Sequence, residues 1–202
     1  MDAKTKGLRY SGKRTKVVSE LSEQELAGLC VKGDAAARRE LYTRYAARLC
    51  SLCRRYLPDD ASAQDMMHDV MIKAFGKIGR FQYRGEGSLY SWLARMAVNM
   101  SIDSLRKARK FKSVDLEAAR GEEASEPDVS DMRKVPRDVL MHFISELPDT
   151  KRTIFNLYYI EEVPHKEIAK MLGIRETSST SLLARARRIL AENINDYLKK
   201  TE

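Results

Sequence analysis

The sequence is poor in turn-forming residues, in cysteine and in long apolar runs. Its 202 residues include only 10 glycines and 5 prolines, which disfavours an all-β fold rich in tight turns. Its 3 cysteines leave one over from any paired disulfide framework, which favours a reducing compartment. No apolar leader opens the chain and no apolar run is long enough to span a bilayer. We therefore expect a cytoplasmic protein without membrane insertion.

The chain also has few groups that hold metals or perform catalysis. Its histidines are scattered at His68, His142 and His165, and it contains no P-loop, dinucleotide-binding fingerprint or nucleophile elbow. The Cys50-x-x-Cys53 pair lacks two further ligands at a spacing that suits zinc, so we interpret both cysteines as structural. The sequence predicts no cofactor, no metal site and no enzymatic activity of its own.

Positive charge is plentiful but unevenly distributed. Lysine and arginine total 37 against 29 acidic residues, a net charge of +8, which favours a polyanionic partner such as nucleic acid. Residues 1–20 are basic and show no apolar period, so we predict a disordered basic tail. Residues 113–134 are acidic and contain glycine, serine and proline, which predicts a flexible linker. Two domains follow, at 21–112 and 135–202.

The first predicted domain shows apolar residues at helical spacing throughout. Ser22 and Glu25 form a capping-box pattern, Asp34 is placed to cap the next helix, and Pro58 interrupts the chain. A further amphipathic helix begins near Ser88. Its C-terminal end is crowded with basic residues: Arg106, Lys107, Arg109, Lys110 and Lys112. Such a basic end suits a nucleic-acid strand with splayed bases, and an ordinary solvated helix face is an equal alternative.

The second predicted domain has four helices and the spacing of a helix-turn-helix in residues 165–190. Ala169 is small enough for two helices to cross closely, and Gly173 permits the positive φ of a sharp turn. The second helix of the motif can lie in a DNA major groove, although an ordinary helical hairpin is the alternative. The candidates for contacts with bases and phosphates are Thr177, Ser178, Thr180, Ser181, Arg185, Arg187 and Arg188.

These motifs together resemble a known family. Residues 63–75 are similar to the core helix of sigma region 2, residues 91–106 to regions 2.3 and 2.4, and residues 146–190 to region 4. The chain is identified as a member of the sigma-70 family of RNA polymerase sigma factors. Because region 1.1 and a folded region 3 are missing, it resembles the extracytoplasmic-function (ECF) type. The implied fold is all-α, with a region 2-like bundle and a region 4-like helix-turn-helix domain joined by a flexible linker.

The resemblance implies a function and a set of partners. The chain would bind core RNA polymerase, at the β′ clamp helices and the β flap, and direct promoter-specific initiation through the minus-10 and minus-35 elements. An anti-sigma factor is a further implied partner. The implied polymerase-binding residues are Asp65, His68, Asp69 and Lys73. The implied minus-10 residues are Arg95, Asn99, Asp103 and Arg106, and the helix-turn-helix candidates above would read the minus-35 element.

The chain departs from the family pattern in places. His68 stands where glutamine is usual, Ser179 stands at a frequent valine, and Thr180 and Leu182 replace a usual basic pair. We therefore expect fewer phosphate contacts and a different minus-35 sequence.

Two alternatives stay open. A stand-alone helix-turn-helix transcriptional regulator would need a dimer interface or a sensor in residues 22–112, and it would bind its operator without polymerase. The acidic linker could thread through a positively charged polymerase channel as an RNA mimic, or act only as a solvated spacer.

Overall fold

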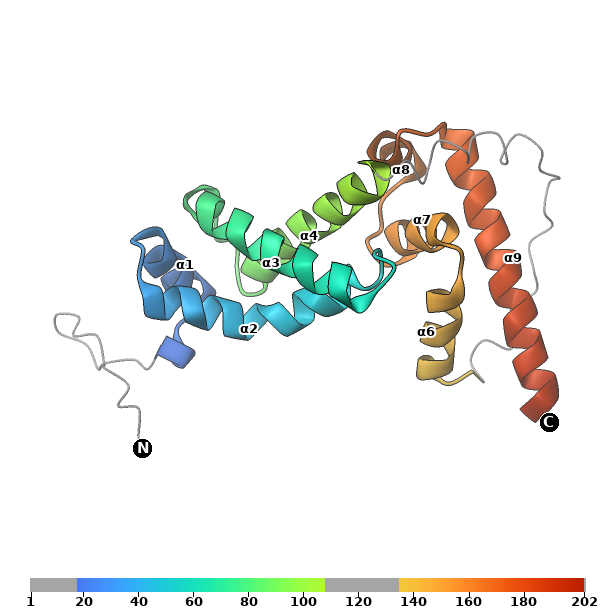
Figure 1. Cartoon of the computed structure of the whole chain (residues 1–202), viewed down its shortest axis with the longest axis horizontal. Helices are drawn as coiled ribbons and strands as arrows, with labels where there is room; N and C mark the ends of the chain where they lie inside the picture. The colour runs from blue at the N-terminus through green and yellow to red at the C-terminus, as the bar shows by residue number, and fades with distance from the viewer. Residues whose placement is uncertain (1–17, 108–134, 202) are drawn as a thin grey trace. The chain divides into compact units, whose positions relative to one another are not determined.

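A computed structural model describes residues 18–107 and 135–201, and within these ranges every regular element is a helix (Figure 1). The all-α prediction is therefore confirmed. No described helix combines the length and the apolarity that crossing a membrane requires. The predicted linker, at 113–134, and residues 1–17 of the predicted tail lie outside the described residues. The elements are η1 Val18–Glu20, α1 Glu23–Val31, α2 Ala35–Cys53, α3 Asp60–Lys77, η2 Ile78–Arg80, α4 Ser88–Lys107, α6 Arg137–Glu146, α7 Asp149–Tyr159, α8 His165–Leu172 and α9 Glu176–Thr201.

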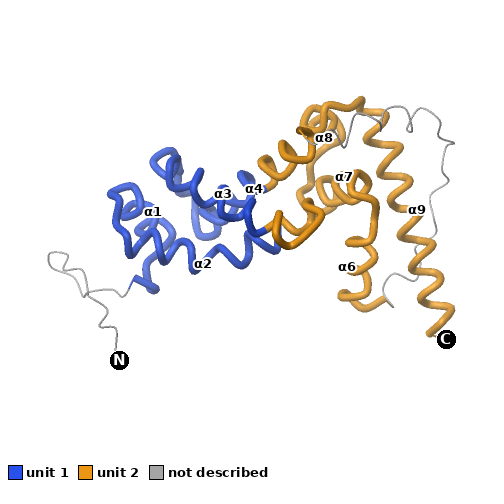
Figure 2. Tube along the Cα trace, in the orientation of Figure 1, with its two compact units in different colours: residues 1–52, 64–97 blue, residues 53–63, 98–202 orange. Residues whose placement is uncertain are grey.

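The chain divides into two compact units, coloured separately in Figure 2. The first unit comprises residues 1–52 and 64–97, and the second comprises residues 53–63 and 98–202. This division passes through α2, α3 and α4. The predicted domain boundaries, at residues 112 and 135, stay a prediction.

Local capping starts the first two helices of unit 1. The hydroxyl of Ser22 accepts the Glu25 N–H at 3.3 Å, and the Glu25 carboxylate accepts the Ser22 N–H at 2.9 Å. This is the predicted capping box, and it satisfies donors that a helix start otherwise leaves open. The Asp34 carboxylate accepts the Ala37 N–H at 2.8 Å and starts α2 in the same way. Each such cap contributes about 1 kcal/mol to the free energy of unfolding.

The segment before α1 is held by α2. Val18–Glu20, which are the last three residues of the predicted tail, form a 3₁₀ helix. The Arg44 guanidinium of α2 donates to the carbonyl oxygens of Ser19 at 3.2 Å and Leu21 at 3.0 Å. Order in this short helix therefore comes from contacts with α2, which the local composition does not indicate.

The core of unit 1 is built from the apolar stripes of its helices. The predicted stripe of α2 is buried at Leu41, Tyr45, Leu49 and Leu52. The other helices contribute buried apolar residues at helical spacing: Leu26 and Cys30 of α1, Val70, Met71 and Ala74 of α3, and Leu89, Leu93 and Ala97 of α4. The opposite faces of α3 and α4 carry exposed side chains.

In unit 2 the long helix α9 packs against the shorter helices α6, α7 and α8. One cluster joins Ile144 and Leu147 to Ala186 and Leu190. The predicted helix-turn-helix is confirmed in its fold, because α8 ends at Gly173 in the left-handed conformation (φ +70°, ψ +36°) and α9 follows.

Two glycine-to-alanine substitutions should change stability in opposite directions. Gly173→Ala should lower the free energy of unfolding by about 1–2 kcal/mol, because an added Cβ meets no neighbour but strains a left-handed backbone. Gly28→Ala, in the exposed middle of α1, should raise it by about 0.5–1 kcal/mol. Urea unfolding followed by circular dichroism measures both. Equal effects of the two changes would contradict the left-handed cap at Gly173.

Candidate nucleic-acid interface

The outer face of α4 carries the predicted minus-10 residues. Arg95, Asn99, Asp103 and Arg106 are all exposed, and their spacing of four, four and three residues places them along one side of a single helix. An Arg106 guanidinium nitrogen lies 2.9 Å from an Asp103 carboxylate oxygen, and both side chains are 52% exposed. An ion pair this exposed is weak, so both groups remain available to a charged ligand.

A cavity of about 540 Å³ lies between the loop after η2 and the first two turns of α4. Arg95 is the one predicted minus-10 residue among those that line it. The lining also includes Arg80, Phe81, Gln82, Arg84 and Trp92, none of which was predicted as a site residue. The run Arg80-Phe81-Gln82-Tyr83-Arg84 interleaves basic and aromatic residues, and this was the sequence signal that could have found the cavity.

Aromatic rings form part of the cavity wall. The ring centroids of Phe81 and Trp92 lie 5.6 Å apart with their planes at 53°. Both side chains are half-buried, so each presents part of its surface to the cavity. Trp92 thus packs against Phe81 and also contacts the open space. Flat apolar surface beside guanidinium groups suits a nucleobase with its phosphate.

The loop that closes the cavity is held in place by its own hydrogen bonds. Gly87, with φ +86°, adopts a conformation that favours glycine. Around it, the Ser88 hydroxyl accepts the Arg84 N–H at 3.2 Å, and the Ser91 hydroxyl donates to the Gly87 carbonyl at 2.9 Å. These bonds join the loop to the first turn of α4, and the cavity is therefore a formed feature of the free chain.

The outer face of α3 carries the predicted polymerase-binding residues. Asp65, Asp69 and Lys73 are exposed. His68 is half-buried, because its ring stacks on Tyr42 of α2 with centroids 6.1 Å apart, and its Nε2 lies 3.0 Å from the Tyr42 hydroxyl. Ile72, 68% exposed on the same face, was not predicted. The face thus combines negative charge with one large apolar side chain.

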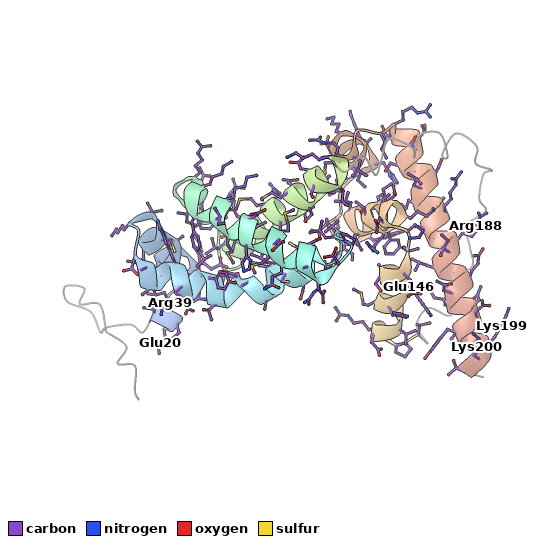
Figure 3. The ribbon with its side chains drawn as sticks, in the orientation of Figure 1. Glu20, Arg39, Glu146, Arg188, Lys199 and Lys200 are labelled. Carbon is purple, nitrogen blue, oxygen red and sulfur yellow. The ribbon has the colours of Figure 1, made fainter. Side chains whose placement is uncertain are left out.

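The predicted minus-35 residues of α9 differ in how far they are exposed. Thr177, Thr180 and Arg188 are exposed, and Arg188 projects away from α6 and α7 (Figure 3). Three further candidates are half-buried at the edge of that face: Ser181, Arg185 and Arg187. Ser178 is different, because only 2% of its surface is exposed and its side chain is turned inward. Ser178 is thus the one buried residue among the seven minus-35 candidates.

A buried polar contact joins the two helices of the helix-turn-helix. The Nδ1 atom of His165, at the start of α8, lies 2.9 Å from the hydroxyl of Ser179 in α9. The Tyr158 ring of α7 stacks on His165 with centroids 4.6 Å apart. Burial lowers the pKa of His165 from its ordinary value, although the nearby Glu176 carboxylate opposes this shift. We name this group, His165, Ser179 and Tyr158, the histidine clasp.

The cysteines form no obvious reactive centre. Cys30 is fully buried, and this burial raises the pKa of its thiol to about 11, which keeps it protonated. Cys53 is also buried and Cys50 is half-buried. In the described part of the chain, no three His, Cys, Asp or Glu side chains gather as metal ligands would.

Comparisons with known proteins match two separate parts of the chain. The family model described as Sigma-70 region 2 matches residues 41–111, and that described as Sigma-70, region 4 matches residues 137–190. The ECF RNA polymerase sigma-E factor of Escherichia coli K12 is 27% identical over 191 residues, which cover 90% of this chain and 98% of the relative. The RNA polymerase sigma-H factor of Pseudomonas aeruginosa is 26% identical, covering 91% of this chain and 100% of the relative. A solved structure of CnrH in complex with the cytosolic domain of CnrY is 21% identical, with a TM-score of 0.44 over 85% of this chain and 96% of that one.

The histidine clasp should make stability depend on pH. Because the folded pKa of His165 is lowered, the unfolded chain binds more protons once the pH falls below about 6.5, and acid then favours unfolding. The free energy of unfolding should therefore fall between pH 8 and pH 5.5. His165→Gln should reduce this loss. Urea unfolding of both proteins across that range provides the measurement, and identical pH slopes would contradict the interpretation.

Proposed function

The chain belongs to the sigma-70 family of RNA polymerase sigma factors, in its ECF type, and on this premise we propose how its surfaces divide the work of promoter recognition. As a sigma factor it binds core RNA polymerase and directs promoter-specific transcription initiation. The observation that carries this function is the pair of matches to regions 2 and 4 in one chain. Sigma factors are non-catalytic initiation factors. This chain, in our proposal, works in the cytoplasm and leaves nucleotidyl transfer to the polymerase.

In this proposal, the cavity beside α4 receives a base flipped out of the non-template strand at the minus-10 element. Extruding a base costs a few kcal/mol, and stacking on an aromatic ring contributes about 1–3 kcal/mol per base. The half-exposed rings of Phe81 and Trp92 can thus offset much of that cost. The polar stripe of α4 would then follow the strand beyond the cavity, using Arg95, Asn99, Asp103 and Arg106.

The exposed face of α9 is proposed to read the minus-35 element in the major groove. Exposed threonines can reach base edges, and arginines can meet guanine or phosphate oxygens. Ser178 is left out, because a side chain with 2% exposure cannot reach DNA while the helix-turn-helix stays folded. The proposed contacts are Thr177, Thr180, Ser181, Arg185, Arg187 and Arg188.

The outer face of α3 is proposed to bind the β′ clamp helices of core polymerase. Ile72 would supply a desolvated apolar centre, with Asp65 and Asp69 as the charged groups beside it. Since His68 is tied to Tyr42, we expect it to support this face more than to contact the partner. On the family resemblance alone, the β flap is proposed to receive the second domain, and an anti-sigma factor to control the chain.

Transcription in vitro tests the function directly. The purified chain is added to core polymerase with a library of genomic fragments, and the transcripts are mapped. We expect initiation from a defined set of promoters that share two spaced motifs, only when both proteins are present. A stand-alone regulator would instead bind an operator without polymerase and initiate nothing. Such a regulator would carry its sensor in residues 22–112. Most of this segment, residues 41–111, matches Sigma-70 region 2 instead.

Removing the acidic pair of α3 should weaken polymerase binding. Asp65→Ala with Asp69→Ala is expected to raise the Kd for core polymerase at least about tenfold, which corresponds to about 1.4 kcal/mol. Fluorescence anisotropy of labelled sigma factor measures this. The matched control is Glu192→Ala with Asp196→Ala, an equally spaced and exposed acidic pair on α9. If the α3 variant binds core polymerase as tightly as the wild type, the docking face is wrong. A control that binds more weakly would report instead on the second domain, which is proposed to meet the β flap.

A further inference from the structure

The start of α4 takes a cap from a distant helix. The residue before α4 is Gly87, which has no side chain to accept the first N–H groups of the helix. The backbone N–H of Leu89 instead donates to the Glu23 carboxylate of α1 at 2.9 Å. Leu89 is fully buried and Glu23 is 3% exposed, so water does not replace this bond. An anion at a helix N-terminus is also favoured by the helix dipole.

The second oxygen of the same carboxylate is occupied too. Glu23 Oε1 accepts a hydrogen bond from the Tyr45 hydroxyl of α2 at 2.8 Å, and Tyr45 is 6% exposed. Burial and the bond to Glu23 raise the pKa of Tyr45, so this hydroxyl remains a donor. Glu23 therefore joins α1, α2 and α4 through two short bonds with one buried carboxylate, and it has no freedom to turn away from either partner.

Tyr90, the residue after Leu89, is in contact with two side chains of α2. The Tyr90 ring lies 6.2 Å from the Tyr45 ring, centroid to centroid. The guanidinium carbon of Arg48 lies 3.5 Å from the Tyr90 ring centroid, within the range of a cation–π contact. We call Glu23, Tyr45 and Arg48 the α4 anchor. Its three side chains contact two consecutive residues in the first turn of α4, Leu89 and Tyr90.

The same two turns of α4 also line the cavity. Ser88, Ser91 and Trp92 lie along the cavity, whereas Leu89 and Tyr90 are held by the α4 anchor. A helix turn moves as a unit, because its residues share backbone hydrogen bonds. Loss of the anchor would therefore let the first turn fray and would displace the cavity residues together. A base pocket tolerates little displacement, since stacking needs a formed surface.

From this arrangement we propose that Glu23 is a positioning residue for promoter opening, holding the first turn of α4 so that the cavity beside it keeps the shape that accepts a flipped base. The proposal rests on the proposed function of the cavity. It also extends the opening machinery to α1, which precedes residue 41, where the match to region 2 begins. Glu23 does not touch the DNA in this scheme and acts only through α4.

The single tryptophan of the chain, Trp92, lines the cavity and reports on it directly. We compare the full-length wild type with Glu23→Ala, Glu23→Gln and Tyr45→Phe, and use Gln24→Ala, exposed on the same helix, as the matched control. The first readout is Trp92 emission and its quenching by acrylamide. The second is the affinity for a single-stranded oligonucleotide that carries the minus-10 sequence found in the transcription experiment.

We expect Glu23→Ala to shift Trp92 emission to the red, increase quenching and weaken oligonucleotide binding at least about tenfold. Gln24→Ala should match the wild type. Glu23→Gln keeps an acceptor oxygen for Leu89 and should recover most of the affinity, and Tyr45→Phe, which leaves the Leu89 bond in place, should have an intermediate effect. In the holoenzyme, Glu23→Ala should reduce permanganate reactivity of minus-10 thymines while the Kd for core polymerase stays unchanged.

The outcomes separate the two proposals. If the wild type responds to the oligonucleotide and Glu23→Ala responds equally, with unchanged Trp92 quenching, the positioning role is overturned even if the variant melts at a lower temperature. If the wild type itself shows no Trp92 response and no affinity, the function proposed for the cavity fails instead. Trp92 quenching in the free chain then still decides whether the anchor holds α4.

Discussion

The need to satisfy the first N–H groups of each helix organises much of this protein. In water these groups are solvated, but packing removes water from the start of α4, where Leu89 and Glu23 are both buried. Side chains meet the need in two ways, and three helices begin without them. Ser22 and Asp34 accept N–H groups from within their own helix start, three residues away. Glu23 does so across 66 residues of sequence. Helices α6, α7 and α8 follow prolines, which supply φ close to helical values but no side-chain cap.

The two kinds of side-chain cap have different consequences for function. A local cap fixes only the register of its own helix, so α1 and α2 start where short-range chemistry dictates. A cap from another helix also fixes the position of one element against another. The bond from Leu89 to Glu23 is of this second kind, and it lies beside the cavity that we assign to base capture. In this chain, therefore, the helix start that most needs a fixed position is the one held from a distance.

The parts of the fold that were predictable from sequence are those decided by neighbours a few residues apart. The capping box at Ser22, the left-handed residue Gly173 and the apolar stripe of α2 all follow from spacings of three or four residues, and the structure contains each of them. The cavity was not predicted, because its wall combines a loop with one face of a helix. Its basic and aromatic run was present in the sequence, but only tertiary structure turns those side chains toward one space.

The sequence pattern also did not show which residues in the first turn of α9 are exposed and which are buried. Consecutive residues differ by about 100° around a helix, so a list of adjacent polar residues always includes some that point inward. Thr177 and Thr180 are exposed, whereas Ser178 and Ser179 between them are buried. Composition alone could not show this, since all four are short and polar. The family pattern offered the better signal, because an apolar residue is frequent at the position of Ser179.

The serine at that position has a physical consequence for the helix-turn-helix. A buried hydroxyl without a partner would destabilise the domain by about 1–3 kcal/mol, whereas a valine needs no partner. His165 meets this requirement at 2.9 Å, and Tyr158 fixes the plane of its ring. Apolar packing tolerates small rotations between two helices, but a hydrogen bond between a ring nitrogen and a hydroxyl is directional. The histidine clasp therefore restricts the crossing of α8 and α9 to the orientation that keeps this bond. It thereby also sets the direction of the exposed face of α9, which we propose to read DNA.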